Sequence, residues 1–177
     1  MKIVVLNENE LKEEEMESIV VKARAIIINS NNEIYLSKYG EMFLLPGGKI
    51  EEDETLLFGL KRELSEELGI IEKNDDFEPL ILIKQYNKGY PSKDNCRFYN
   101  RLNITYYYLL KTNEDININE SHLTISESAN NFKTIIVDIE KAKEMVRSSS
   151  SNNLRANFYS KEFEVIFNEI DSLKETV

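Results

Sequence analysis

The sequence predicts an α+β fold in which a mixed β-sheet packs between helices, and three observations support this. Short runs rich in β-branched residues are interspersed with amphipathic helical segments. These elements do not alternate as strand–helix–strand units would. The length, 177 residues, is that of one ordinary domain. We therefore expect a single domain over residues 18–177, preceded by an acidic lead-in over residues 1–17.

The strands are predicted from extended apolar runs and the turns that separate them. Residues 18–28 and 33–38 flank the polar turn Asn29–Asn32, which favours a β-hairpin. A third short run, Phe43–Leu45, ends at the Pro-Gly-Gly sequence of residues 46–48. Later strands are expected at Glu78–Tyr86, Leu102–Leu110 and Lys133–Val137.

The clearest helix is predicted over Thr55–Leu68. Its leucines at positions 57, 60, 64 and 68 recur at spacings of three and four and should form the buried stripe. Thr55 or Asp53 can cap its N-terminus, and Gly69 can close its C-terminus. After a helical segment at Ile139–Val146 and a polar break at Ser148–Asn153, we expect a final amphipathic helix over Phe158–Leu173, whose apolar side carries Phe163, Ile166, Phe167 and Ile170.

Charge and composition exclude several classes of protein. The chain has 32 acidic and 22 basic residues, a net charge of −10, which argues against binding duplex nucleic acid. The single cysteine, Cys96, excludes an internal disulfide and Cys-based zinc motifs. Neither a signal-peptide pattern nor a membrane-spanning apolar run is present. These features predict a cytoplasmic protein that does not bind membranes.

Three glutamates share one face of the helix predicted at Thr55–Leu68. On a helical wheel at about 100° per residue, Glu66 and Glu67 fall about 60° and 40° from Glu63, roughly opposite Leu57 and Leu68. Like charges at these spacings repel. A divalent cation, which prefers oxygen ligands, would explain the cluster, and a backbone carbonyl of the nearby Pro-Gly-Gly turn can add a further ligand. The alternative is a charged, solvated helix face.

The same residues form a sequence motif. Gly48, Glu54 and the run Arg62-Glu63-Leu64-Ser65-Glu66-Glu67-Leu68-Gly69-Ile70 match every fixed position of the Nudix box, GX5EX7REUXEEXGU, in which U is a bulky aliphatic residue. The chain therefore resembles the Nudix hydrolase family, with the box spanning Gly48 to Ile70. This resemblance implies a Nudix-type α/β/α sandwich.

The resemblance also implies a metal site that requires Mg²⁺ or Mn²⁺. Glu63 and Glu67 would be the principal metal ligands, and Glu66 would either bind metal or position a water molecule. Gly47 would offer its carbonyl oxygen to the metal. Arg62 would orient a glutamate through paired, charged hydrogen bonds.

The implied reaction is hydrolysis of a diphosphate bond in a nucleoside diphosphate linked to another moiety, such as a nucleotide, a dinucleoside polyphosphate or a nucleotide sugar. In this family, a carboxylate on the helix that carries the box, here predicted over Thr55–Leu68, or on a later loop can serve as the general base. Glu127 is the preferred loop candidate, although it can also be read as an exposed loop residue. The alternative function is a Nudix-fold nucleotide-binding or regulatory protein without turnover.

A basic segment, Lys84–Arg101, carries five cations and one acid, and aromatic residues lie between them. It can bind phosphates while its rings stack on a base or sugar, or it can be an ordinary basic hairpin. The candidate substrate-binding residues are Arg24, Lys49, Tyr86, Lys88 and Arg97. The predicted partner is a small nucleotide-type substrate, and a homodimer is compatible with the sequence.

Overall fold

The computed structural model describes residues 1–69, 77–92, 95–111, 132–150 and 154–174. Within these ranges the chain forms the following elements in order: β1 (Lys2–Leu6), a short 3-10 helix η1 (Glu13–Glu15), β2 (Ser18–Ile28), β3 (Glu33–Tyr39), β4 (Met42–Leu44), β5 (Gly47–Lys49), α1 (Leu56–Leu68), β6 (Glu78–Pro91), β7 (Phe98–Lys111), β8 (Lys133–Asp138), α3 (Ile139–Ser150) and α4 (Leu154–Lys174).

The strands of the described residues form one mixed sheet. Its main order is β1-β6-β7-β2-β3-β4, with β5 paired to β2 and β8 paired to β3. The pairs β1–β6 and β2–β7 are parallel, and the remaining pairs are antiparallel. The α+β prediction with a mixed sheet is thereby confirmed.

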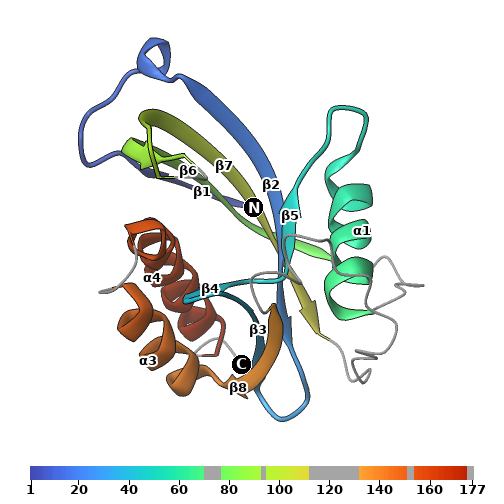
Figure 1. Cartoon of the computed structure of the whole chain (residues 1–177). Coiled ribbons are helices and arrows are strands. Elements are labelled where there is room, and N and C mark those ends of the chain that lie inside the picture. The colour runs from blue at the N-terminus through green and yellow to red at the C-terminus, as the bar shows by residue number, and fades with distance from the viewer. Residues whose placement is uncertain (70–76, 93–94, 112–131, 151–153, 175–177) are drawn as a thin grey trace.

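Helices cover both faces of this sheet. Figure 1 shows α1 on one face and the pair α3 and α4 on the other. Two groups of buried side chains fill these layers: one joins the sheet to α3 and α4, and the second joins it to α1. The α/β/α sandwich predicted from the sequence is confirmed. No helix in the described ranges is long and apolar enough to cross a bilayer.

The predicted hairpin at residues 18–38 forms as β2 and β3. Asn29 holds its turn, because its side-chain oxygen accepts the backbone N–H groups of Asn31 and Glu33 at 3.0 and 2.9 Å. Asn32 takes a positive φ of 62°, which asparagine tolerates better than most residues. Local polar residues therefore define this turn, as the sequence indicated.

Helix α1 begins and ends as predicted. The Thr55 hydroxyl accepts the N–H of Phe58 at 3.3 Å, and Gly69 closes the helix with a φ of 64°. Leu60, Leu64 and Leu68 are fully buried. The prediction was wrong for Leu57, which is 36% exposed, because the helix face that meets the sheet is centred on Leu60 and Leu64.

The other differences concern element lengths. The predicted lead-in supplies β1, which pairs with β6 and is therefore part of the sheet. The strands β6 and β7 extend beyond the predicted bounds, to Pro91 and from Phe98. Helix α3 continues to Ser150, so the predicted polar break at Ser148 starts too early. Helix α4 buries all four apolar residues that were expected on its inner side: Phe163, Ile166, Phe167 and Ile170.

Candidate active site

The Gly47–Gly48 segment lies tightly between β2 and α1. Gly47 has a φ of 116°, and a Cβ atom there would lie 2.9 Å from the Cα of Arg24. A Cβ on Gly48 would lie 2.5 Å from both carboxylate oxygens of Glu63. The two glycines therefore let β5 approach the carboxylates of α1 more closely than any other residues could.

Glu67 joins α1 to this segment. Its side chain is 7% exposed, and Oε2 accepts the backbone N–H of Gly47 at 3.0 Å and the hydroxyl of Ser37 at 3.2 Å. A buried carboxylate is costly unless it is hydrogen-bonded. The glutamate face was expected roughly opposite Leu57 and Leu68, but Glu67 is buried against the sheet on the same helix as the fully buried Leu68.

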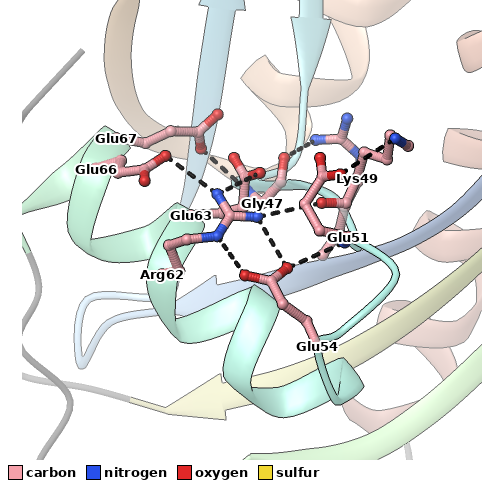
Figure 2. Close-up of polar contacts among 9 residues, drawn as sticks. Gly47, Lys49, Glu51, Glu54, Arg62, Glu63, Glu66 and Glu67 are labelled. Atoms are coloured by element: carbon pink, nitrogen blue, oxygen red, sulfur yellow. Dashed lines mark hydrogen bonds and ion pairs between the residues drawn. The ribbon is translucent and has the colours of Figure 1, made fainter. Parts of the chain in front are cut away.

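Arg62 organises the remaining carboxylates (Figure 2). Its Nε and Nη2 donate to the two oxygens of Glu54 at 2.6 and 3.1 Å. Its Nη1 donates to Glu63 at 3.0 Å and to Glu66 at 3.2 Å. The hydrogen bond from Arg62, followed by that from the backbone N–H of Glu51, lowers the pKa of Glu54 to about 2. Glu54 thus stays ionised and fixes the guanidinium group.

Burial has the opposite effect on Glu63. It raises the pKa of this carboxyl above the ordinary value, and the positive charge and hydrogen bond of Arg62 only partly oppose the shift. A nearby cation would therefore stabilise the charged form of Glu63.

The donor set fits a hard divalent cation in its chemistry. The carboxylates of Glu63, Glu66 and Glu67 and the carbonyl of Gly47 are all oxygen donors. In the part of the chain that the structure describes, however, no three His, Cys, Asp or Glu side chains form a ready metal cage. Arg62 bonds to one oxygen of Glu63 and one oxygen of Glu66, so a cation can bind through the second oxygen of each carboxylate.

A cavity of about 270 Å³ opens beside these groups. Its lining combines Glu63 and Glu67 of α1 with aromatic and cationic side chains from β2, β6 and α4. Among the residues that line it are Arg24, Lys49, Glu63, Glu67, Tyr90 and Tyr159.

Two predicted substrate-binding residues lie at this cavity. Arg24 is 6% exposed, and its Nη1 donates to the carbonyls of Leu45 and Gly47, the latter at 2.8 Å. Lys49 is exposed and lies 3.4 Å from Glu51. Arg24 therefore supports the glycine segment from within the sheet, while the ammonium of Lys49 remains close to solvent.

The other three predicted substrate-binding residues lie apart from the cavity. Tyr86 donates its hydroxyl to Glu13 at 3.3 Å, Arg97 forms an ion pair with Glu17 at 3.0 Å, and Lys88 is exposed. The reason is that β6 and β7 stay paired along this basic segment, which packs against the acidic lead-in instead of folding over the carboxylates. Glu127, the predicted loop base, falls outside the described residues.

Sequence reasoning missed a polar cluster behind the cavity. Lys22 is 5% exposed and donates to the Tyr159 hydroxyl at 3.3 Å. Burial, partly opposed by the charge of Glu162, lowers the pKa of Lys22 to about 8. Lys22 and Arg24 alternate within the apolar run of residues 19–28, so strand periodicity alone places two cations on one buried face. That alternation was the available signal.

Comparison with known proteins gives a match to a family model. A family model described as the NUDIX domain matches residues 19–152. An 8-oxo-dGTP diphosphatase from Haemophilus influenzae is 35% identical over 81 residues, covering 42% of this chain and 56% of that protein. An 8-oxo-dGTP diphosphatase from Buchnera aphidicola is 44% identical over 50 residues, covering 25% of this chain and 38% of that protein. The matches thus span about half or less of these relatives.

Solved structures also match at low identity. The MutT protein from Methanosarcina mazei Go1 shares 22% identity with a TM-score of 0.47, covering 70% of this chain and 80% of that one. A MutT protein from Bacillus halodurans shares 17% identity with a TM-score of 0.45, covering 71% of this chain and 72% of that one.

Proposed function

Because the chain belongs to the NUDIX domain family, we propose that it is a divalent-metal-dependent hydrolase that cleaves the diphosphate bond of a nucleoside diphosphate linked to another moiety. The observation that carries this proposal is the cavity beside α1, whose lining includes the carboxylates of Glu63 and Glu67 and the cationic side chain of Arg24. Cleavage of a diphosphate requires positive charge near its oxygens. It also requires carboxylates that bind the divalent cation.

The carboxylates and the arginine of the box have defined tasks in this proposal. Glu63, Glu66, Glu67 and the Gly47 carbonyl would hold Mg²⁺ or Mn²⁺, which supplies charge neutralisation at the diphosphate and a more acidic water nucleophile. Arg62, fixed by Glu54, keeps the carboxylates on one side of the cavity before the cation arrives. This arrangement limits their mutual repulsion.

The substrate would be held by cations on the sheet side. Arg24 is fixed by two carbonyls and lines the cavity, and the exposed Lys49 contributes a second charge to the lining. These groups favour a polyanion. For removal of a proton from water, Glu127 is proposed as the base, with a box carboxylate as the alternative.

The relatives provide the first substrate to test. Their name states that they hydrolyse 8-oxo-dGTP, so this nucleotide should head a panel that also holds a dinucleoside polyphosphate and a nucleotide sugar. Product release should require Mg²⁺ or Mn²⁺, stop on addition of a chelator and return when the metal is restored.

Glu67→Gln is the informative variant. It keeps an oxygen that can accept the N–H of Gly47, so the fold should be retained, but it removes the charge. We expect a loss of ~100-fold or more in kcat. Glu78→Gln, an exposed strand residue away from the cavity, is the matched control. Tight binding of a panel member that neither protein cleaves would instead favour the non-catalytic alternative.

A further inference from the structure

Ser37 lies on β3, outside the Nudix box, and its hydroxyl faces α1. The side chains of a strand alternate between its two faces. Leu36 packs in the cluster with α3 and α4, whereas Tyr35 packs in the cluster with α1. Ser37 therefore shares the face of Tyr35. It is 1% exposed and lines the cavity beside α1, where a buried hydroxyl is costly unless it forms a hydrogen bond.

The hydrogen bond of Ser37 joins β3 to the helix that carries the carboxylates. Its hydroxyl donates to Oε2 of Glu67 at 3.2 Å, and the backbone N–H of Gly47 donates to the same oxygen at 3.0 Å. A carboxylate oxygen offers about two lone-pair sites, so the two donors together fill the acceptor capacity of Oε2. Figure 2 shows the other carboxylate oxygen of Glu67 pointing away from Gly47. A cation can therefore be bound by Glu67 through Oε1 alone.

Glu67 is restricted more firmly than the other two carboxylates of the candidate metal site. Arg62 Nη1 donates to one oxygen of Glu63 at 3.0 Å and to one oxygen of Glu66 at 3.2 Å. Those two glutamates and the arginine are partly exposed, whereas Glu67 is buried and is held by donors from the two strands β3 and β5. The orientation of Glu67 is thus set by the sheet, and Ser37 supplies the side-chain part of that restraint.

The number of oxygens that a carboxylate offers affects which cation it prefers. Mg²⁺ requires a near-octahedral shell, keeps several water ligands and takes few carboxylates. Mn²⁺ likewise suits octahedral oxygen ligands. Ca²⁺ is larger, takes more oxygen ligands and often binds both oxygens of one carboxylate. A carboxylate that can use only one oxygen therefore lowers the number of ligands available to Ca²⁺ and leaves the smaller cations unaffected.

We infer that Ser37 is a positioning residue whose hydroxyl keeps Glu67 in a one-oxygen binding mode, and that this mode favours Mg²⁺ or Mn²⁺ over Ca²⁺. The inference rests on the proposed function, which assigns the cation to these carboxylates. Ser37 acts through Glu67 and does not itself bind the cation or the substrate. An alanine in its place would leave a lone pair of Oε2 open, so that Glu67 could bind Ca²⁺ through both oxygens.

The test is a calorimetric titration of the full chain with MnCl₂ and with CaCl₂, in the absence of substrate. We expect wild type to bind Mn²⁺ more tightly than Ca²⁺. In Ser37→Ala the ratio of the Ca²⁺ Kd to the Mn²⁺ Kd should fall by ~10-fold, because residues that orient metal ligands typically change affinity by this much. Ser37→Thr keeps the hydroxyl and should keep the ratio. Ser172→Ala, which removes a hydroxyl bonded to the Asn168 carbonyl near the C-terminal end of α4, is the matched control and should also keep it.

Two further measurements separate positioning from a purely structural role. Thermal unfolding shows which variants fold, and Ser37→Cys, whose thiol is a weak donor, replaces Ser37→Ala if that variant is unfolded. In a Glu67→Gln background, Ser37→Ala should change the ratio by less than ~2-fold, because both residues act through one bond. The inference is overturned by an unchanged ratio in folded Ser37→Ala, by an equal change in the Glu67→Gln background, or by a wild type that binds Ca²⁺ as tightly as Mn²⁺ or binds neither.

Failure of this inference is distinct from failure of the proposed function. A chain that shows the expected ratios but hydrolyses no substrate refutes the proposed function alone. A metal-dependent hydrolase whose ratio does not depend on Ser37 refutes the inference alone.

Discussion

The buried ammonium of Lys22 should make stability depend on pH in a predictable direction. Its pKa falls from 10.5 to about 8, mainly because burial disfavours the charged form. A group whose folded-state pKa is depressed contributes stability above its unfolded pKa and loses that contribution as the pH falls through the folded pKa. Lys22 should therefore stabilise the fold least below pH 8 and most near pH 10.5.

The magnitude follows from the size of the shift. Each pKa unit corresponds to about 1.4 kcal/mol, so the change from 10.5 to about 8 amounts to about 3 kcal/mol. The reference variant is Lys22→Met, which keeps an unbranched side chain without a charge. The charged and titratable groups that act on Lys22 are present in both proteins: Arg24, Tyr90, Arg101, Tyr159 and Glu162.

The assay is urea unfolding of wild type and Lys22→Met at several pH values between 7 and 10.5. The free energy of unfolding of wild type minus that of the variant should rise by about 3 kcal/mol across this range. The attraction between Lys22 and Glu162 is already contained in the pKa of Lys22, so it adds nothing to this rise. A difference that stays constant, or falls, with rising pH would show that Lys22 is not buried as a cation in the folded protein.

Three further predictions concern α1 and the residues that pack against it. Gly48→Ala places a Cβ 2.5 Å from both carboxylate oxygens of Glu63. The displaced carboxylate should lower turnover by ~10-fold or more, while the far-ultraviolet circular dichroism spectrum stays unchanged. Glu54→Gln removes the charged partner of Arg62, and we expect kcat to fall by ~10-fold, with a kcat equal to wild type contradicting a positioning role. Leu60→Ala should cost about 2–5 kcal/mol in urea unfolding, and Leu57→Ala less than ~1 kcal/mol, because only the first is fully buried.

Local patterns predicted much of this fold. The hairpin at residues 18–38 depends on Asn29, whose side chain bonds to its own turn, and α1 depends on a threonine cap and a glycine stop. Such signals act over a few residues, so they can be read without the tertiary structure. The spacing of the Nudix box likewise brought Glu63, Glu66 and Glu67 onto one helix.

The residues that line the candidate substrate cavity could not be predicted in the same way. Tyr86, Lys88 and Arg97 have the residue types expected of a nucleotide-binding loop. On the paired strands β6 and β7, however, Tyr86 and Arg97 bond to Glu13 and Glu17 of the lead-in, and Lys88 is exposed. Strand pairing between distant segments, and not local composition, decides which residues face a cavity.

The sequence by itself determined the family motif, the helix that carries the carboxylates and the α+β class, because each depends on short-range spacing and periodicity. Only the tertiary structure decided that Glu67 is buried against Gly47, and that Lys22 lies under Tyr159 of α4, 137 positions away. The physical reason is that burial and hydrogen bonding between distant strands and helices depend on the packed sheet. No local pattern encodes that packing.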